Sequence, residues 1–365
     1  MISSCDSGSL PFNGDASKFL DGAKGFDHQI NDNSSAYFEK IVIESFLDKI
    51  RVGLDLPNYP QFRDMSQMIL DMIDGLEKLK EGYIETSVLT LKPNNILPEI
   101  AVLEKNSKLI EEKAEKSFEV RVCITGPYTL ASFFPYKNEE TFTRLGLVIS
   151  QILEKSLFCN RYGKTVLVSI DEPLFGLMDD PLIDFGSDGR ENLRKSWETI
   201  FCIAKSKNIK TMIHLHSTAN PLFWEISNLD IIDSHVNDPL IQMKKTRELL
   251  ESEDKFLKAS LAINDFDILI KKKIVSSSKE KIIESETNQG IANTWSLIQK
   301  GKIDPLQFLE TSKIMEKRLF EIIGRFGPER IQYSGPECGL KGYPTYETAL
   351  ECLRRISKIT KNFGE

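Results

Sequence analysis

KTMIHLHSTANPLFWEISNLDIIDSH, residues 210–235, contains two short apolar runs, and each run ends in histidine. The first, Lys210–His214, leads into His216, and the second, Leu229–Ser234, leads directly into His235. Short apolar runs bounded by turn-forming residues predict buried strands. Polar side chains that follow such strands are typical of a parallel sheet with a site at the carboxyl ends of its strands.

The same alternation of a short apolar run and a longer helical pattern extends along the whole chain, which predicts βα units and a parallel sheet. The strand candidates are Ile2–Ser4, Ile50–Leu54, Glu119–Ile124, Thr165–Ile170, Lys210–His214, Leu229–Ser234, Phe256–Ala262 and Arg330–Tyr333. The helix candidates are Tyr37–Leu47, Met65–Lys80, Glu99–Glu115, Glu140–Asn160, Arg190–Lys205, Pro239–Glu251, Pro305–Phe326 and Tyr346–Lys361. We therefore predict an α/β fold, a (β/α)8 TIM barrel that forms a single domain over residues 1–365.

One connection is too long for an ordinary βα loop. Residues 264–304 follow the seventh predicted strand and contain Lys271–Lys273, Ser276–Ser278 and a helical pattern near Gly290–Gln299. Loops in α/β units usually have about 2–6 residues. We therefore predict an insertion or lid after strand seven.

Composition limits the partners and the compartment. The chain of 365 residues has a net charge of -7, 41% hydrophobic residues and six scattered cysteines. Nucleic acids and anionic membranes need a concentrated positive field, so we expect neither as a partner. No stretch of about 20 apolar residues is present, and the start at Met1 lacks a basic and then apolar leader. We expect a cytoplasmic protein with reduced thiols.

Three of the four histidines fall at the predicted ends of two adjacent strands. Residues i and i+2 of a strand face the same way, so His214 and His216 can share one metal ion. On the next strand either Asp233 or His235 could be the third ligand. We favour His235, because imidazole suits zinc, with Asp233 as the acceptor that fixes a histidine tautomer. Cys338, after the last strand, supplies a thiolate.

Each of these residues taken alone fits a plainer interpretation, namely a hydrogen-bonded barrel histidine or a buried thiol. The set favours zinc, because chance seldom gathers three of four histidines at one barrel mouth. A shifted register that pairs His216 with Thr218 is the alternative, and it is chemically poorer because a neutral hydroxyl is a weak zinc ligand.

Several motifs resemble the zinc-containing catalytic, C-terminal half of cobalamin-independent methionine synthase, which is itself similar to the uroporphyrinogen decarboxylase-like methyltransferases. The resemblance spans nearly the whole chain. Besides the His214-x-His216 pair, it rests on Gly8-Ser9-Leu10-Pro11, Arg63-Asp64-Met65, Ile124-Thr125-Gly126-Pro127, Ile170-Asp171-Glu172-Pro173 and Pro336-Glu337-Cys338-Gly339-Leu340.

The resemblance implies a methyltransferase in which zinc binds the sulfur of homocysteine and the thiolate attacks an activated methyl group to give methionine. Asp171 would hold the substrate ammonium group, and Ser9 would position the carboxylate end. An acidic residue near the end of strand two also contacts the amine, and Asp55 is our candidate for it. The implied substrate-binding set is Gly8, Ser9, Asp55, Asp171 and Glu172, and the implied catalytic residues are Asp171 and His235.

The ligand set departs from the family pattern. This chain has His214-x-His216 where the family has His-x-Cys, and His235 where the family has Glu. Neutral imidazoles with one thiolate leave zinc more positive, which lowers the pKa of a bound thiol and makes its thiolate a weaker nucleophile. We therefore expect a methyl donor more reactive than an N5-methyl pterin. A methylcorrinoid, brought by a corrinoid protein, is the leading candidate, and a methyl-tetrahydropterin is the alternative.

Other functions stay open on the sequence alone. The small-molecule thiol could be coenzyme M or another thiol, although Asp171 suits an ammonium group and would repel a sulfonate. A uroporphyrinogen decarboxylase-like lyase would need no metal. A non-catalytic metal-binding relative would need neither Asp171 nor the Gly8-Ser9 motif.

Overall fold

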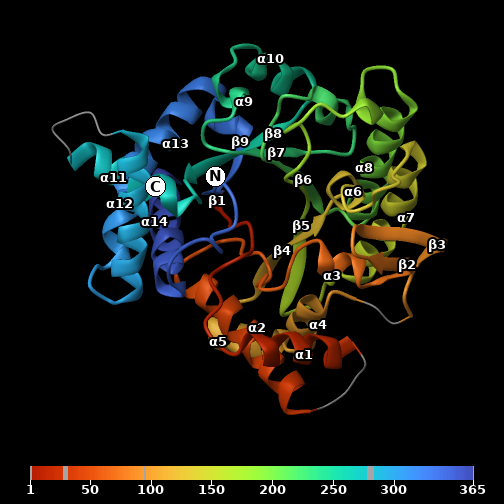
Figure 1. Cartoon of the computed structure of the whole chain (residues 1–365), viewed down its shortest axis with the longest axis horizontal. Helices are drawn as coiled ribbons and strands as arrows, with labels where there is room; N and C mark the ends of the chain where they lie inside the picture. The colour runs from red at the N-terminus through yellow and green to blue at the C-terminus, as the bar shows by residue number, and fades with distance from the viewer. Residues whose placement is uncertain (1, 28–31, 94–95, 278–282, 365) are drawn as a thin grey trace.

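A curled parallel sheet with helices around it organises the computed structural model, which describes residues 2–27, 32–93, 96–277 and 283–364 (Figure 1). Its seven strands are ordered β1 (Ser3–Ser4), β9 (Ile331–Pro336), β8 (Phe256–Ala262), β7 (Ile231–Ser234), β6 (Lys210–Leu215), β5 (Gly163–Glu172) and β4 (Phe118–Thr125). All neighbouring pairs are parallel. The arrangement is consistent with a TIM-like barrel that regular strands do not close completely.

Residues 54–61 fill the gap between the two edge strands β1 and β4. The Leu56 amide donates to the Ser4 carbonyl at 2.9 Å, and the Arg121 amide donates to the Pro57 carbonyl at 3.0 Å. The pairings of Leu56 with Cys5 and of Asn58 with Arg121 are isolated parallel bridges rather than a regular ladder. This segment therefore takes the place of an eighth strand without forming one.

The prediction for the second strand is wrong. Ile50 belongs to α2 (Asn33–Arg51), and the pairing with the sheet begins only at Leu56. The run 50–54 is apolar because it ends a helix packed on the sheet, and apolar content alone does not distinguish this from a buried strand.

The helix predicted over Met65–Lys80 is also wrong beyond its first turns. A short α3 (Gln67–Leu70) leads into an antiparallel hairpin of β2 (Ile73–Leu79) and β3 (Gly82–Leu91). Gly75 and Gly82 have φ values of +87° and +142°, which side-chain-bearing residues rarely adopt. β3 is rich in β-branched and aromatic residues, which favour strands.

The remaining elements follow the predicted order, with shifted or divided ends. Helices predicted as continuous are divided into α4 (Pro98–Lys105) and α5 (Ser107–Ala114), into α9 (Pro239–Gln242) and α10 (Lys245–Ser252), and into a 3-10 turn (Pro305–Phe308) and α13 (Ser312–Phe326). The other helices are α1 (Ala16–Asp27), α6 (Pro127–Ala131), α7 (Glu139–Lys155), α8 (Asp188–Ser206) and α14 (Tyr346–Gly364), and 3-10 turns span Pro181–Ile183, Pro221–Glu225 and Pro328–Arg330. Helices thus connect and flank the parallel strands, as the alternation predicts.

The connection after β8 forms extra helices, α11 (Phe266–Ser277) and α12 (Glu284–Gln299), before α13. The rings of Phe266 and Trp295, one from each helix, lie 5.5 Å apart between centroids, and Phe266 also lies 5.2 Å from Tyr343 beyond β9. These contacts fix the base of the predicted insertion beside the carboxyl end of the sheet. Its role as a lid stays a prediction, and Ser278 of the predicted polar run lies outside the described residues.

The side chains inside the curled sheet are apolar at its amino end and include polar and charged residues further along the strands. A compact apolar cluster of Cys5, Leu56, Leu167, Met212, Ile231 and Tyr333 fills the amino end. Further along the same strand faces lie buried polar and charged side chains, among them Arg121, Ser169, Asp233 and Lys258. Charged side chains therefore begin beside the apolar cluster, where Arg121 and Lys258 pair in register with Leu167 and Tyr333, and continue toward the carboxyl ends of the strands.

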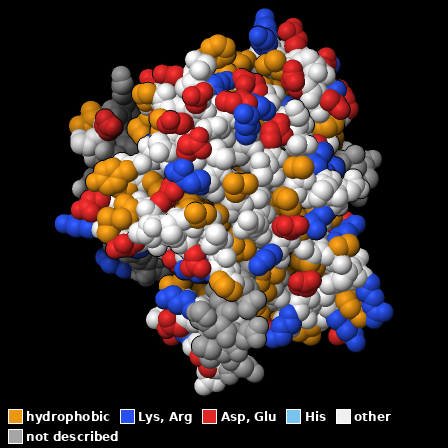
Figure 2. Space-filling view, turned by 90° about the vertical axis from the view of Figure 1, so that its right-hand side faces the viewer, with side chains coloured by type: hydrophobic (Ala, Val, Ile, Leu, Met, Phe, Trp, Pro, Cys, Tyr) orange, Lys and Arg blue, Asp and Glu red, His pale blue; other side chains and the backbone are white. Residues whose placement is uncertain are grey.

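The outer surface carries charges of both signs. On the face in Figure 2, Lys and Arg side chains are interspersed with Asp and Glu, and hydrophobic side chains form small separate patches. The expectation that the protein binds neither nucleic acid nor a membrane stays a prediction. Among the described residues, no helix combines the length and apolar character needed to cross a bilayer.

Candidate metal centre

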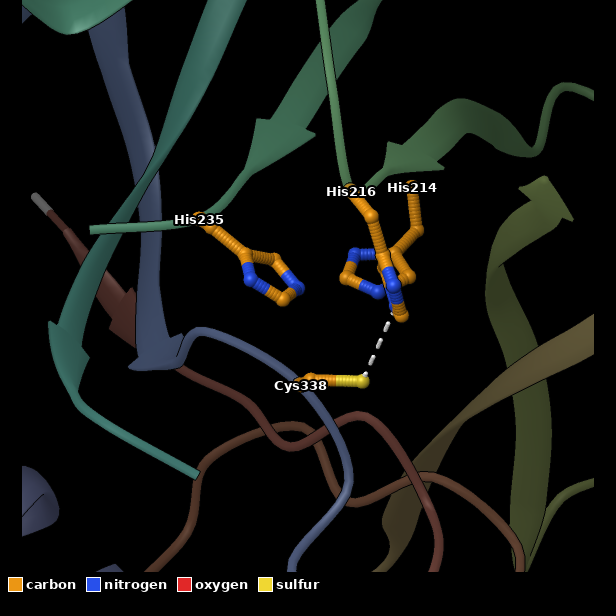
Figure 3. A group of neighbouring side chains, drawn as sticks. All are labelled: His214, His216, His235 and Cys338. Atoms are coloured by element: carbon orange, nitrogen blue, oxygen red, sulfur yellow. Dashed lines mark hydrogen bonds between the residues drawn. The ribbon is translucent and has the colours of Figure 1, made fainter. Parts of the chain in front are cut away.

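Four potential metal ligands converge above the charged interior. His214 lies in β6 and His216 follows that strand, His235 follows β7, and Cys338 follows β9. One ligand atom from each of the four lies within 4.8 Å of every other, and Figure 3 shows the side chains directed toward a common point. The structure therefore brings together the four residues that the sequence proposed as ligands.

The spacing of these atoms fits a tetrahedral ion after small side-chain rotations. Zn–N and Zn–S bonds of about 2.0–2.3 Å place tetrahedral ligand atoms about 3.3–3.6 Å apart. Cys338 Sγ lies 3.5 Å from His216 Nε2. The rings of His216 and His235 are 4.3 Å apart between centroids, and those of His214 and His235 are 5.9 Å apart.

The hydrogen bonding of the imidazoles supports a cation at this point. The His214 Nδ1–H group donates to Asp233 Oδ2 at 3.0 Å, which leaves Nε2 as the ring nitrogen directed at the cluster. Nε2 of His214 and Nε2 of His235 are both buried without a hydrogen-bond partner. Leaving a buried polar atom unpaired costs about 1–3 kcal/mol, and ligation of a metal ion would satisfy both atoms. The residues present therefore fit zinc.

Asp233 is the acceptor that orients His214, as the sequence predicted, and a lysine holds it in turn. Lys258 Nζ donates to Asp233 Oδ1 at 2.8 Å and to the Pro336 carbonyl at 2.6 Å, and the Lys258 and Asp233 side chains are fully buried. Although burial opposes it, Lys258 keeps the pKa of Asp233 well below its usual range. Burial would lower the pKa of His214, but Asp233 and Cys338 together outweigh burial and raise it to about 10.

The thiol of Cys338 is acidic in the metal-free cluster. Burial alone would raise its pKa, but the neighbouring imidazoles of His214, His216 and His235 together outweigh burial and lower the pKa well below the usual range. Thiolate is the form that binds metals. The cluster therefore presents a thiolate before any ion arrives.

Glu337 holds the ends of three strands together beside the cluster. Its Oε2 accepts the Val236 amide at 3.0 Å, and its Oε1 accepts the Asn264 amide at 2.9 Å. Oε2 also lies 4.0 Å from His235 Nδ1. These contacts join the residues after β7, β8 and β9 and thereby position His235 and Cys338.

A cavity of about 270 Å³ adjoins the cluster on one side. His214, His216 and Cys338 contribute to its wall, and its polar lining includes Ser7, Ser9, Gln61, Arg63, Asp64, Asp171 and Lys341. We call this space the thiol cavity. It is small, and its wall includes the charged residues Arg63, Asp64, Asp171 and Lys341, which suits a compact substrate with charged groups.

Asp171 lies in the wall of the thiol cavity beside the cluster, because Asp171 of β5 pairs in register with His214 of β6. The Ser169 hydroxyl donates to its Oδ1 at 2.8 Å, and Arg121 Nη2 is 3.8 Å away. Burial raises the pKa of Asp171 above its usual value, while His214 and Arg121 oppose the shift. A substrate cation would relieve this burial cost.

Gly8 and Ser9 are both near the cavity, with different roles. Ser9 lines it, whereas Gly8 has a φ of +106°. A Cβ atom on Gly8 would come within 2.2 Å of Asn58 Nδ2 and 2.4 Å of Gln61 Oε1. Gly8 therefore allows the backbone to approach residues 58–61, and Ser9 is the residue of the pair that can contact a ligand.

The expectation that Asp55 lies at the site is overturned. Asp55 Oδ2 accepts both the amide and the hydroxyl of Ser4, and Asp55 lines a hollow with Phe118, the first residue of β4. It therefore lies at the amino end of the sheet, because the pairing segment starts later than predicted. Asp64, three residues after the pairing segment 54–61, is the acidic residue of this region that lines the thiol cavity.

The placement of Glu172 also corrects an expectation, because its carboxylate is used inside the protein. It accepts the amides of Tyr128 and Thr129 at the start of α6 at 2.9 and 2.7 Å, and Trp197 Nε1 at 2.9 Å. Glu172 is fully buried and is absent from the thiol cavity wall. It fixes α6 against α8 rather than facing a substrate.

Sequence reasoning assigned no role to Arg121, Lys258, Glu337, Gln61 or Asp64, although Glu337 and Asp64 lie within the motifs quoted above. A usable signal was present for Arg121 and Lys258, because each is a lone cation inside an otherwise apolar strand run, and buried cations need partners. The other three required knowledge of the loops that bring them to the site.

Comparisons with known proteins agree on the fold. No protein-family model matches the chain, and no curated protein matches it in sequence. A solved B12-independent methionine synthase from Shewanella sp. W3-18-1, in complex with selenomethionine, has a TM-score of 0.60 and 12% identity, covering 100% of this chain and 98% of that chain. A putative B12-independent methionine synthase from Listeria monocytogenes has a TM-score of 0.56 and 15% identity, covering 100% and 99%. The chain therefore shares its fold with B12-independent methionine synthase-like proteins over its full length.

Proposed function

We propose that this protein is a zinc-dependent methyltransferase that moves a methyl group to a small thiol, with homocysteine, which becomes methionine, as the favoured acceptor. The observation that carries the proposal is the cluster of His214, His216, His235 and Cys338, with two unpaired buried Nε2 atoms, beside a small cavity whose wall includes charged residues. The methionine synthase names of the structural neighbours point in the same direction.

The chain's own residues account for binding and orientation. A zinc ion held by the four residues would lower the pKa of the substrate thiol and keep its sulfur as a thiolate. Asp171 would bind the substrate ammonium group from the cavity wall, and Ser9 would contact the carboxylate end. Arg121, 3.8 Å from Asp171, keeps that carboxylate ionised and in place.

His235 is the ligand that we expect a substrate thiol to displace from the zinc ion. A tetrahedral site with four protein ligands is closed, whereas catalytic sites keep one open position. The His235 side chain is 26% exposed, against 3% for that of His214, and its Nδ1 has a 4.0 Å contact with Glu337 Oε2. Displaced from the ion, its imidazole could receive the thiol proton.

The donor class follows from the charge of the ligand set. Three neutral imidazoles and one thiolate leave the ion with a net positive charge, and the bound thiolate is therefore a weaker nucleophile. We propose a donor more reactive than an N5-methyl pterin, with a methylcorrinoid carried by a protein as one class that qualifies.

The test combines metal analysis with product detection. Purified protein is expected to contain about one zinc per chain and, with homocysteine and methylcobalamin, to form methionine detected by mass spectrometry. Chelation should abolish turnover and zinc should restore it. Protein that binds zinc but forms no methylated thiol with any donor would instead be a metal-binding protein, and activity without metal would favour a lyase-like or other metal-free reaction.

A further inference from the structure

A second cavity adjoins the metal cluster. It has a volume of about 590 Å³ and is lined by His216 and His235 together with residues of the insertion and its neighbours: Asn264, Asp265, Phe266, Asp267, Trp295 and Gly342. His216 lines both cavities, whereas His214 and Cys338 line only the first. Ligands of the cluster therefore border two cavities with different linings.

The two cavities are lined by different chemistry. The thiol cavity includes the cations Arg63 and Lys341. The second cavity contains no Lys or Arg among its lining residues, but it has two exposed carboxylates and an indole. An ammonium or sulfonium group is attracted both by carboxylates and by the face of an indole ring. An anionic ligand would be repelled at the same place.

The local structure holds this lining in position. Trp295 Nε1 donates to Asp267 Oδ1 at 2.6 Å, and the buried Phe266 ring packs against Trp295. Asp265 Oδ1 accepts the amides of Asp267 and Ile268 at 2.9 and 3.2 Å, which fixes the first turn of α11. The carboxylates are thus held on a helix start that is anchored to the end of β8.

We propose that the second cavity binds the methyl donor, and that this donor is a small cation whose methyl group is attached to a sulfonium or quaternary ammonium centre. The inference rests on the proposed function. It names a donor class that meets the same reactivity requirement as a methylcorrinoid, since an onium centre leaves as a neutral molecule. The cavity size is also that of a small-molecule site, within the usual range of about 300–1,000 Å³.

The transfer balances without an oxidant or reductant. The thiol proton leaves first, to His235 or solvent. The thiolate electron pair then forms the new S–CH3 bond, while the bond between the methyl carbon and the donor sulfur or nitrogen breaks. That bonding pair stays on the donor atom, so the cation becomes a neutral thioether or amine.

The first experiment measures binding, so that it does not depend on turnover. Tetramethylammonium is titrated calorimetrically into the zinc-loaded protein, with the neutral, similarly shaped 3,3-dimethyl-1-butanol as a comparison. We expect the cation to bind more tightly than the alcohol, and Asp265→Asn and Asp267→Asn each to weaken it about two- to fivefold. Asp74→Asn, at an exposed position of β2, is the matched control and should leave binding unchanged. Equal binding of cation and alcohol, or no effect of both variants, would overturn the proposal.

The second experiment measures transfer with deuterated trimethylsulfonium and homocysteine, followed by mass spectrometry of trideuteromethyl methionine. We expect turnover, and we expect Trp295→Leu to raise KM for the sulfonium more than kcat falls, with Trp295→Phe partly restoring KM because it retains an aromatic ring. Turnover with methylcobalamin or a methyl pterin but not with the sulfonium overturns the donor class and leaves the proposed function standing. No methylated thiol from any of the three donors instead contradicts the proposed function, and the binding experiment then decides whether the cavity selects cations.

Discussion

The amino end and the carboxyl end of the sheet interior are stabilised in different ways, although both are formed by residues of the same strands. On β6, Met212 belongs to the apolar cluster at the amino end, and His214, two residues later on the same face, belongs to the metal cluster. On β7, Ile231 likewise belongs to the apolar cluster, and Asp233, two residues later, belongs to the buried charged pair with Lys258. The amino end is stabilised by burial of apolar surface, while the carboxyl end contains charges that need specific partners. We infer that stability can be altered at one end without loss of metal binding, whereas a change at the other end affects both.

The largest effect is expected at the ligands. His214→Ala should weaken zinc binding at least about 100-fold, because it removes one ligand and leaves Asp233 without its hydrogen-bond donor. Zinc affinity is measured by competition with a chromophoric chelator, and methyl transfer by product mass spectrometry. Unchanged zinc affinity would show that His214 is not a ligand.

A slightly smaller effect is expected for the cation beneath the cluster. Lys258→Met should lower the free energy of unfolding by about 3–5 kcal/mol, because Asp233 then stays buried without its main counter-charge. Zinc affinity should also fall, by about 10- to 100-fold, since Asp233 orients His214. Denaturant unfolding and chelator competition measure the two effects.

The control for that substitution lies on another strand of the sheet. Lys210→Met changes the same residue type at the exposed start of β6, where Lys210 Nζ donates to Gln332 and lies 5.7 Å from the centre of the Tyr333 ring. It should alter the free energy of unfolding by less than about 0.5 kcal/mol. A similar loss in both variants would mean that the Lys258–Asp233 pair has no special role.

The amino end should show stability loss without functional loss. Leu167→Ala removes a fully buried side chain from the apolar cluster and should cost about 2–5 kcal/mol of unfolding free energy. Zinc content of the folded variant should remain about one per chain, because no charged group or ligand is touched. A variant that folds but loses zinc would contradict the separation of the two ends.

The smallest effect concerns the reactivity of the metal-free cluster. The lowered pKa of Cys338 means that its thiolate persists below the pH at which an ordinary thiol, with a pKa near about 8.5, is protonated. Iodoacetamide should therefore alkylate Cys338 at pH 6 faster than a cysteine in an unstructured reference peptide, and zinc should protect it. Peptide mass spectrometry gives the rates. Slow alkylation at pH 6 that rises in parallel with the reference peptide would contradict the pKa direction.

Much of the fold and the metal cluster could be predicted because both depend on local spacing. The period of two along a strand places His214 and His216 together, and parallel strands bring their carboxyl ends to one edge, which adds His235 and Cys338. The second strand could not be predicted in the same way. Its apolar run, 50–54, ends a helix, and the true pairing segment, 54–61, contains two prolines and makes only isolated bridges.

The errors at Asp55 and Glu172 have the same physical origin. Sequence patterns indicate that a carboxylate follows an apolar run, but they do not indicate which donors reach it in the folded chain. Asp55 accepts hydrogen bonds from Ser4, and Glu172 accepts hydrogen bonds from the start of α6 and from Trp197. These contacts hold both carboxylates outside the wall of the thiol cavity.

The sequence by itself determined the alternation of strands and helices and the residue types of the metal cluster, because both are carried by short-range periodicity. Only the tertiary structure decided which carboxylates face a cavity, that Lys258 stands behind Asp233, and that the insertion places Asp265, Asp267 and Trp295 beside His235. These relations join residues far apart in the chain, and their energies depend on burial and on partners, which exist only once the chain has folded.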